Sequence, residues 1–347
     1  MYKIFLSILT LLVSLTSTSH LIAQNSADYY YQLTQENFAD TKYTPQRTRS
    51  MVLYGDDPNE IIEFSLNHKL YRNLEVLQLM TNNITVLDTV WQNLPNLKML
   101  RINNTDLKTM PKNIVLATNI SYLDLENNKL TEIPYHLAAL PHLIALDLGS
   151  TLYGGNQISI IDERILQFKS LKSLMVSQNP IDSICPAFCL LKELVVFNCT
   201  QTKLKTLPTN FGKLHQLKSL RISSNPLLTK LPPTFAALDS LVQLDIAYLP
   251  NCVSLNNYDF INNFKQLKVI DLSLPTAKVL PKQLYNLTAL THLNIYGADK
   301  LDFESTIAQL KQIKNLQYAL FLSHNYNAKQ QSIFNKKMFP VEIQFVN

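Results

Sequence analysis

Apolar residues recur along this chain at a fixed spacing, with polar residues between them. Starting at Leu74, leucines occupy the first, fourth and sixth positions of a segment whose ninth position is Asn82. The same order returns at Ile120, with Asn128 in the ninth position. The residues in the fourth position are Leu77, Leu100, Leu123, Leu146, Leu174, Phe197, Leu220, Leu244, Ile270, Leu293 and Leu320. Most of them follow the one before by 23 residues, which identifies an internal repeat.

Within each repeat the alternation predicts one β-strand. Of Leu77, Gln78 and Leu79, the two leucines point to one side of an extended chain and Gln78 points to the other. A single strand cannot bury its leucines, but stacked copies form a parallel sheet with one continuous core. Leu-Pro pairs such as Leu207-Pro208 precede apolar residues at helical spacing and predict short helices or 3-10 turns. The predicted fold is an α/β solenoid, a horseshoe with a parallel sheet on its concave side and these turns on its convex side.

Polar side chains recur at the ninth position, where the chain turns off the strand. The asparagines there are Asn82, Asn128, Asn179, Asn225 and Asn325, and the threonines that replace them are Thr105, Thr151 and Thr202. Asn and, more weakly, Thr side chains bond to nearby backbone groups, so we expect them to hold this turn.

The repeat register also predicts where the solenoid begins and ends. Counting 23 residues back from Leu77 reaches Tyr54, and counting forward from Leu320 reaches Ile343. We therefore expect a solenoid over residues 51–347 with a degenerate first repeat and a terminal capping strand, because a solenoid must cover its open ends. Residues 24–50 do not fit the repeat and are expected to form an N-terminal capping segment; a floppy leader is the alternative.

Residues 1–23 have the three parts of a secretory signal peptide. Lys3 precedes an apolar stretch from Ile4 to Leu15, and a polar stretch then leads to Ala23. The apolar stretch is too short to cross a bilayer, and no later stretch is long and apolar enough to do so. We expect cleavage after Ala23 and export to the cell envelope or the medium, with no transmembrane span.

Composition and motifs argue against several classes of function. The net charge is only +5 and no run of Lys or Arg occurs, so nucleic acid is not an expected partner. The six glycines leave little material for glycine-rich phosphate loops, and no His-Glu-x-x-His or Gly-x-Ser-x-Gly motif occurs. The sequence therefore predicts no enzyme, no cofactor and no metal site.

The four cysteines do not form a dense disulfide framework. Cys199 stands where other repeats have an inward leucine and is expected to be a small core residue. Cys185 and Cys189 either form a local disulfide or remain thiols, and their spacing does not decide between the two.

The pattern Leu-x-x-Leu-x-Leu-x-x-Asn, followed by a Leu-Pro pair, resembles the 23-residue LxxLP subclass of leucine-rich repeats. Members include Ras-pathway scaffold proteins, plant Ras-group-related proteins and many bacterial surface or secreted proteins. The resemblance covers residues 51–347 and implies protein–protein interaction, since the subclass has no common catalytic residue. The cysteine-rich flanking caps of animal extracellular members are missing, which favours a bacterial origin.

These observations predict a non-enzymatic, secreted or surface-exposed module that binds a protein on its concave face, with a surface glycan as an alternative ligand. The competing hypothesis is an intracellular scaffold in small-GTPase-type signalling, which the resemblance implies and the signal peptide argues against. Repeat-associated ubiquitin-ligase effectors also resemble this architecture, but they need a further catalytic domain.

Two clusters of outward positions are the candidate partner-binding residues, because aromatic side chains beside a few charges are typical of binding hot spots. The C-terminal cluster consists of Asp245, Tyr248, Asp271, His292, Asn294, Tyr296, Phe321 and His324. The N-terminal cluster consists of Met99, Arg101, Tyr122, Asp124 and Glu126.

Paired carboxylates raise the question of a cation. Asp245 and Asp271 are expected on neighbouring strands, as are Asp124 and Asp147. Calcium takes six to eight oxygen ligands, which a flat pair does not supply. Since arginines lie one strand away, structural charge pairing is the expected role.

Two repeats are longer than the rest, with insertions at residues 152–157 and near residues 250–258. Such insertions map to loops on one face and often to the binding face, but tolerated loop drift explains them equally well.

Overall fold

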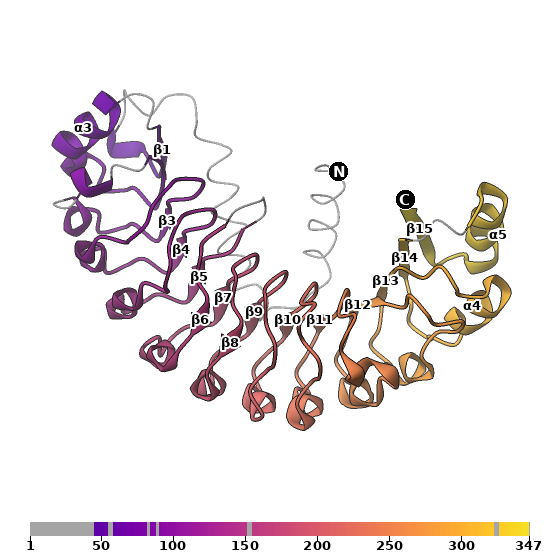
Figure 1. Ribbon diagram of the computed structural model, residues 1–347. Coiled ribbons are helices and arrows are strands. Elements are labelled where there is room, and N and C mark those ends of the chain that lie inside the picture. Colours follow the sequence, from indigo (N-terminus) through magenta and orange to yellow (C-terminus); the bar gives the residue numbers. More distant parts are fainter. Residues whose placement is uncertain are drawn as a thin grey trace. The chain divides into compact units, whose positions relative to one another are not determined.

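The computed structural model describes residues 45–54, 58–81, 84–87, 90–150, 155–322 and 326–346. These residues form two compact units: residues up to Leu125 together with 136–146, and residues 126–135 together with those from Asp147 onward. Thirteen parallel strands are ordered as in the chain, β1 to β5 in the first unit and β7 and β9 to β15 in the second (Figure 1). β5 ends at the boundary between the units.

The strands of the large sheet are short, three to five residues each. They are β1 (Ser50–Tyr54), β2 (Val76–Met80), β3 (Met99–Arg101), β4 (Tyr122–Asp124), β5 (Ala145–Asp147), β7 (Ser173–Met175), β9 (Val196–Asn198), β10 (Ser219–Arg221), β11 (Gln243–Asp245), β12 (Val269–Ser273), β13 (His292–Tyr296), β14 (Tyr318–Leu322) and β15 (Glu342–Val346). A separate two-stranded sheet pairs β6 (Ile160–Ile161) with β8 (Ser183–Ile184).

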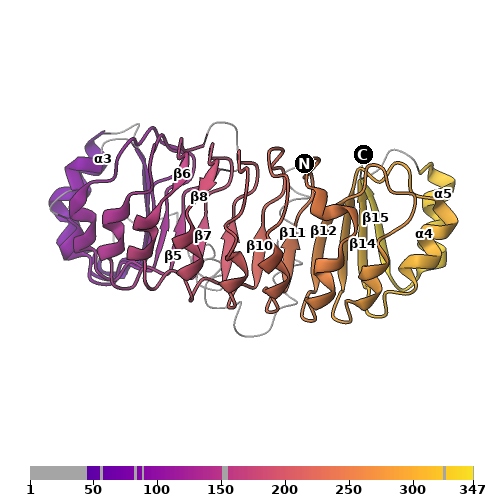
Figure 2. The same ribbon diagram turned by 60° about the horizontal axis from the view of Figure 1, so that its bottom comes forward.

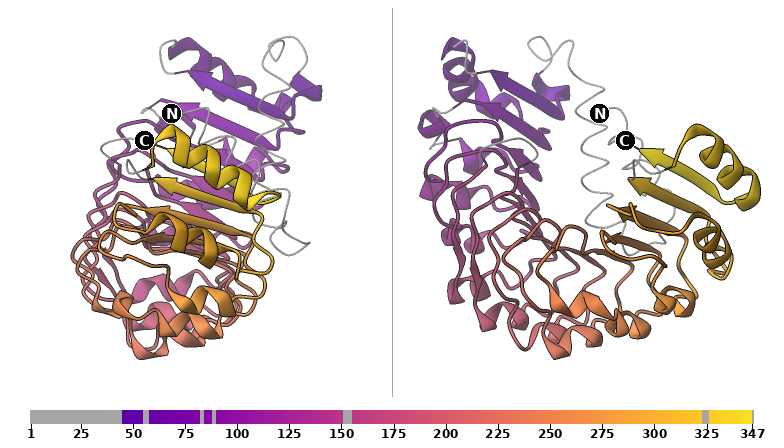
Figure 3. Two further views of the ribbon diagram at one scale, coloured as in Figure 1. Left: turned by 90° about the vertical axis from the view of Figure 1, so that its right-hand side faces the viewer. Right: turned by 45° about the vertical axis from the view of Figure 1, so that its right-hand side comes forward.

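Most return segments are 3-10 helices, as the sequence predicts. They are η1 (Pro45–Arg47), η2 (His68–Leu70), η3 (Ile84–Leu87), η4 (Trp91–Asn93), η5 (Lys112–Leu116), η6 (Tyr135–Ala139), η7 (Glu163–Gln167), η8 (Pro186–Leu190), η9 (Phe211–Lys213), η10 (Pro233–Ala237), η11 (Val253–Asn256), η12 (Asp259–Asn263) and η13 (Lys282–Asn286). The described α-helices are α3 (Pro58–Asn67) beside the first strand, and α4 (Phe303–Leu310) and α5 (Ala328–Met338) near the last ones (Figure 3).

The core of each unit lies between the sheet and the return segments (Figure 2). Apolar residues at the first, fourth and sixth positions, such as Leu217, Leu220 and Ile222, are fully buried. In the second unit the rings of Phe188, Phe211 and Phe235 stack in sequence at 6.3 Å along the return segments. The strand side chains that alternate with the inward ones lie on the opposite side of the sheet, which we call the open face.

Asparagine side chains hold the turns after β7 and β10 of the second unit, namely Asn179 and Asn225. Asn225 donates to the carbonyls of Cys199, Ile222 and Ser223, at 2.8, 2.9 and 3.3 Å, and its oxygen accepts from the Leu204 amide. Because Cys199 and Leu204 belong to the preceding repeat, one side chain joins two repeats.

The insertion at residues 152–157 changes which residue takes this role. Thr151 lies outside the described residues, whereas Asn156 is fully buried, donates to the Leu148 carbonyl and accepts from the Leu130 amide. Asn156 therefore links the two repeats at this turn, and the expectation for Thr151 lies outside the described residues.

The first repeat exists, but its predicted register is wrong. Met51, not Tyr54, pairs with Leu77, and Tyr54 pairs with the exposed Met80 at the end of the strands. The interval is longer than expected because α3 replaces a shorter 3-10 turn.

The predicted register of β14 is wrong by one residue. Ala319 pairs with Leu293 and Phe321 pairs with Ile295, so Phe321 points into the core and is 0% exposed. The four successive apolar residues 319–322 fit either register, and the aromatic cluster at this end decides it. The ring of Phe321 lies 5.4 Å from that of Phe334 in α5 and 5.8 Å from that of Phe345 in β15.

Replacing Asn225 by alanine is expected to destabilise the second unit by about 3 kcal/mol, because several buried backbone groups lose their partners. The matched control is Asn251→Ala, since this exposed side chain donates only to the Pro226 carbonyl and its loss should cost less than about 1 kcal/mol. Urea unfolding followed by circular dichroism measures both. Equal losses would contradict the role of Asn225 as a link between repeats.

The register of β14 predicts that Phe321→Ala lowers the free energy of unfolding by roughly 3–5 kcal/mol, the usual cost of removing a core aromatic ring. Leu320→Ala, on the open face of the same strand, should cost less than half as much. Thermal unfolding of the two variants ranks them, and a larger loss for Leu320→Ala would restore the register that the sequence suggested.

Candidate functional site

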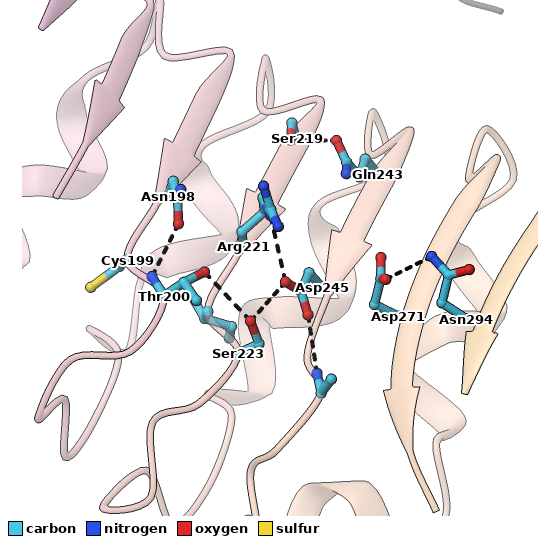
Figure 4. Close-up of polar contacts among 12 residues, drawn as sticks. Asn198, Cys199, Thr200, Ser219, Arg221, Ser223, Gln243, Asp245, Asp271 and Asn294 are labelled. Atoms are coloured by element: carbon cyan, nitrogen blue, oxygen red, sulfur yellow. Dashed lines mark hydrogen bonds and ion pairs between the residues drawn. The ribbon is translucent and has the colours of Figure 1, made fainter. Parts of the chain in front are cut away.

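A row of polar side chains crosses the open face of the second unit from β9 to β13 (Figure 4). Each strand places its central outward residue next to that of its neighbour, because the strands pair in register. The residues in this row are Asn198, Arg221, Asp245, Asp271 and Asn294. Asn198 and Asp245 also accept from the backbone amides two residues later, Thr200 at 3.1 Å and Ala247 at 3.3 Å. The polar row therefore helps to shape the end of its own strands.

Asp245 is the better neutralised of the two carboxylates in this row. Its Oδ2 accepts from the Ser223 hydroxyl at 2.7 Å and lies 3.5 Å from the Arg221 Nε. The same arrangement occurs in the first unit, where Arg101 Nε lies 3.0 Å from Asp124 Oδ2. In both places an arginine of one strand pairs with an aspartate of the next.

Asp271 faces Asp245 directly across β11 and β12 and has a different environment. Its Oδ1 accepts from Asn294 Nδ2 at 2.8 Å and from the Tyr296 hydroxyl at 3.3 Å. Burial raises the pKa of Asp271 to about 7, and the negative charge of Asp245 acts in the same direction. The protonated form of Asp271 is therefore favoured more than that of an exposed aspartate.

Two tyrosines border this carboxylate pair. The ring of Tyr248 lies 5.3 Å from that of Tyr296, and Tyr248 is 44% exposed. Burial, followed by the nearby charges of Asp271 and Asp245, raises the pKa of Tyr296, so its hydroxyl stays protonated and donates. Tyr248 and Tyr296 therefore present aromatic surface beside the carboxylates of the polar row.

The backbone of Tyr248 is unusual. Its φ of 53° is left-handed, as is that of the residues at the equivalent turns Asn104, Asn127, Gln178, Gln201, Ser224 and Gly297. Small or amide side chains tolerate this conformation better than a large ring does. The Tyr248 amide donates to the Ser273 hydroxyl at 2.8 Å, and Tyr258 of the nearby insertion donates its hydroxyl to the Ser273 carbonyl at 3.4 Å. The insertion near residues 250–258 thus supports the turn that carries Tyr248.

The remaining members of the predicted C-terminal cluster do not join this group in the same way. His292 is buried, its ring lies 5.6 Å from that of Tyr318, and burial lowers its pKa. Phe321 was predicted on the wrong face and is a core residue, which leaves no side-chain surface for a partner. His324 lies outside the described residues.

The predicted N-terminal cluster offers less surface than expected. Met99 and Tyr122 are buried together with Val76 and Ala145 in one apolar cluster of the first unit. Asp124 is also buried and accepts from Asn103 Nδ2 at 3.2 Å in addition to its bond with Arg101. Glu126, which is partly exposed, belongs to the second unit.

The candidate residues predicted from the sequence include neither Arg221 nor Ser223. Their spacing from Asp245, about one repeat, is the signal that could have found them, because residues one repeat apart lie side by side.

The other side of the second unit has an open, mainly apolar pocket of about 340 Å³. It is lined by Leu231, Pro232, Phe235, Val253 and Phe260.

Several other features bear on function. The four cysteines are buried and unbridged, and burial raises the pKa of the Cys199 thiol to about 12. No three His, Cys, Asp or Glu side chains within the described ranges are grouped so that they could hold a metal ion. In the same ranges, no helix has the length and hydropathy needed to cross a membrane.

Comparisons with known proteins agree with the repeat. The family model described as Leucine Rich Repeat matches residues 119–140 and 216–238. The adenylate cyclase of Schizosaccharomyces pombe is 26% identical over 281 residues, which are 80% of this chain and 14% of the cyclase. Human oligodendrocyte-myelin glycoprotein is 30% identical over 176 residues, 50% of this chain and 36% of that protein. The chain thus spans a minor part of the length of these relatives.

Solved structures show the same fold. A leucine-rich-repeat protein of Leptospira interrogans aligns with a TM-score of 0.53 at 22% identity, covering 89% of this chain and 98% of that one. An internalin of Listeria monocytogenes aligns with a TM-score of 0.53 at 17% identity, covering 83% and 92%. The repeat in the sequence, the matching family model and the parallel sheet backed by 3-10 helices agree, and this chain is a leucine-rich-repeat protein.

Proposed function

We propose that this protein is an exported, non-enzymatic module that binds a protein partner on the open face of its second unit. The observation that carries the proposal is the exposed ring of Tyr248, held beside Tyr296, whose hydroxyl donates to Asp271 in the row of polar residues. Tyrosines bring large contact area at a small cost in conformational entropy, and they are enriched in binding hot spots. Leucine-rich repeats in general suggest protein binding, which agrees with this surface.

The polar row suits binding better than catalysis. Its ionisable groups lie along a flat sheet and pair with one another, whereas an active site brings acids, bases and donors together around one reacting atom. The similarity to an adenylate cyclase extends over 14% of that protein, and we propose that what the two share is the repeat.

The sequence of residues 1–23 supports export, although these residues lie outside the described part of the chain. Within the N-terminal cluster, Glu126 belongs to the second unit, keeps partial exposure and is proposed as a peripheral contact. The competing proposal is an intracellular scaffold of the small-GTPase-signalling type.

Export predicts that the mature protein begins at about Gln24 and is recovered outside the cytoplasm. Intact mass and N-terminal sequencing of the protein from cell fractions and growth medium measure both. A chain that begins at Met1 and stays in the cytosol would exclude export and favour the scaffold.

Photocrosslinking tests the binding face. A photoreactive phenylalanine at position 243, on the open face, should form adducts with proteins of the cell surface or medium, whereas the same group at Leu190, exposed on η8, should form few. Tyr248→Asn removes the exposed ring with a residue that tolerates a left-handed backbone, and it should lower the adduct yield at least fivefold. Equal adducts from both positions, or no effect of Tyr248→Asn, would remove the open face as the binding surface.

A further inference from the structure

An arginine-binding arrangement within this chain provides a comparison for the open face. In the second unit, the guanidinium of Arg164 lies 4.3 Å over the ring of Tyr135. It donates to both oxygens of Asp162, with Nη2 to Oδ2 at 2.8 Å, and to Glu132 at 3.1 Å. One guanidinium thus contacts an aromatic face and two carboxylates together, which is the pairing that its flat, forked shape favours.

The open face holds the same kinds of group, but no cation of the described residues lies over its tyrosine rings. Asp245 and Asp271 supply two carboxylates in register, and Tyr248 and Tyr296 supply two rings 5.3 Å apart. Arg221 approaches Asp245 alone, at 3.5 Å. Among the described residues, no basic side chain comes within ion-pair distance of Asp271, and no hydrogen bond reaches its Oδ2.

The charge balance of this row also favours an additional cation. The two carboxylates have one arginine between them, which pairs with Asp245. Burial and the negative charge of Asp245 disfavour the ionised form of Asp271 and raise its pKa to about 7. A cation beside both carboxylates would stabilise the ionised form. A bare metal ion is a poor candidate, since calcium takes six to eight oxygen ligands. An arginine needs fewer oxygens and gains from the rings.

We infer that Asp245, Asp271, Tyr248 and Tyr296 form a binding site for an arginine side chain of the partner. The inference rests on the proposed function of the open face and adds the chemistry of the group that it recognises. The guanidinium donates to the free Oδ2 of Asp271 and lies against the exposed ring of Tyr248, while Arg221 remains with Asp245.

The probe is a fluorescein-labelled, acetylated Arg-Gly-Arg-Gly-Arg-Gly amide, titrated with the full chain in fluorescence anisotropy. The peptide is expected to bind, and its citrulline counterpart, which keeps the shape and loses the charge, is expected to bind at least tenfold more weakly. The lysine counterpart should bind less well than arginine, because an ammonium group lacks the planar fork. Absence of binding by the arginine peptide, or equal binding of the citrulline peptide, overturns the inference.

The variant Asp271→Asn keeps the shape of the side chain and its bond with Asn294, and should weaken binding of the arginine peptide at least tenfold. The matched control is Asp239→Asn, which removes one exposed carboxylate between η10 and β11 and should leave the affinity unchanged. Circular dichroism confirms that each variant is folded. Equal affinity of Asp271→Asn and the wild-type chain contradicts the assignment.

The pH dependence gives an independent readout. Asp271 loses its proton as the pH rises through about 7, so the affinity should fall about tenfold from pH 8 to pH 6 while guanidinium stays charged. The groups that face Asp271 are Asp245 on β11, Arg221 on β10, and Asn294 and Tyr296 on β13. The dependence should disappear in Asp271→Asn; if it persists there, another group such as His292 causes it and the role of Asp271 is wrong.

The two proposals fail in distinguishable ways. If the arginine peptide does not bind but Tyr248→Asn still lowers photocrosslinking from position 243, the open face binds a partner of different chemistry. If the peptide binds and photocrosslinking shows no preference for the open face, the arginine site exists but the proposed function is wrong.

Discussion

The structure depends on one constraint: no repeat can satisfy its own backbone or bury its own leucines. Each strand is only three to five residues long, and the turn that follows exposes carbonyls and amides that need partners. The buried Asn225 meets this need by bonding to carbonyls of its own repeat and of the preceding one. Asn179 bonds in the same way to the carbonyls of Val176 and Leu148. Stacking is therefore a condition for each repeat to fold, and stability is shared between neighbours.

This constraint separates the positions that build the fold from those that are free to vary. Inward positions must be apolar and many of the turns carry an amide or hydroxyl, but the outward positions only have to suit the next strand. The open face can consequently carry Asn198, Arg221, Asp245 and Asp271 in one row without a change in the core. The pairs Arg101–Asp124 and Arg221–Asp245 show the simplest solution, in which neighbouring charges cancel. Asp271 differs from these pairs, because its neighbour on β11 is another aspartate, Asp245.

The repeat made most of the fold predictable, since each strand and return segment is specified by local spacing. Prediction failed where the spacing was ambiguous. Residues 319–322 are all apolar, so only the contacts of Phe321 with α5 and β15 fix their register. The role of Asn156 at the turn after β5 was not predicted, because Asn156 lies in an insertion that the repeat spacing does not cover. The sequence placed Met99, Asp124 and His292 on the strands where they lie, but it could not give their burial. How deeply a side chain is buried depends on the residues of the neighbouring repeats, and a local sequence pattern does not include those residues.

Two unfavourable features meet at one place on the second unit. Tyr248 has a large ring on a left-handed backbone, where the equivalent turns use mainly asparagine, glutamine, serine or glycine. Asp271 keeps a carboxylate beside Asp245 at the cost of a raised pKa. At the equivalent positions, the outward residue of β13 is Asn294 and the left-handed residue of an earlier turn is Ser224. Conflicts between local preference and fold are expected at functional sites, where the rest of the structure holds a residue in an unfavourable state. Their coincidence on Tyr248 and Asp271, which Tyr296 connects through its ring and its hydroxyl, is the strongest physical argument that this part of the open face binds a partner.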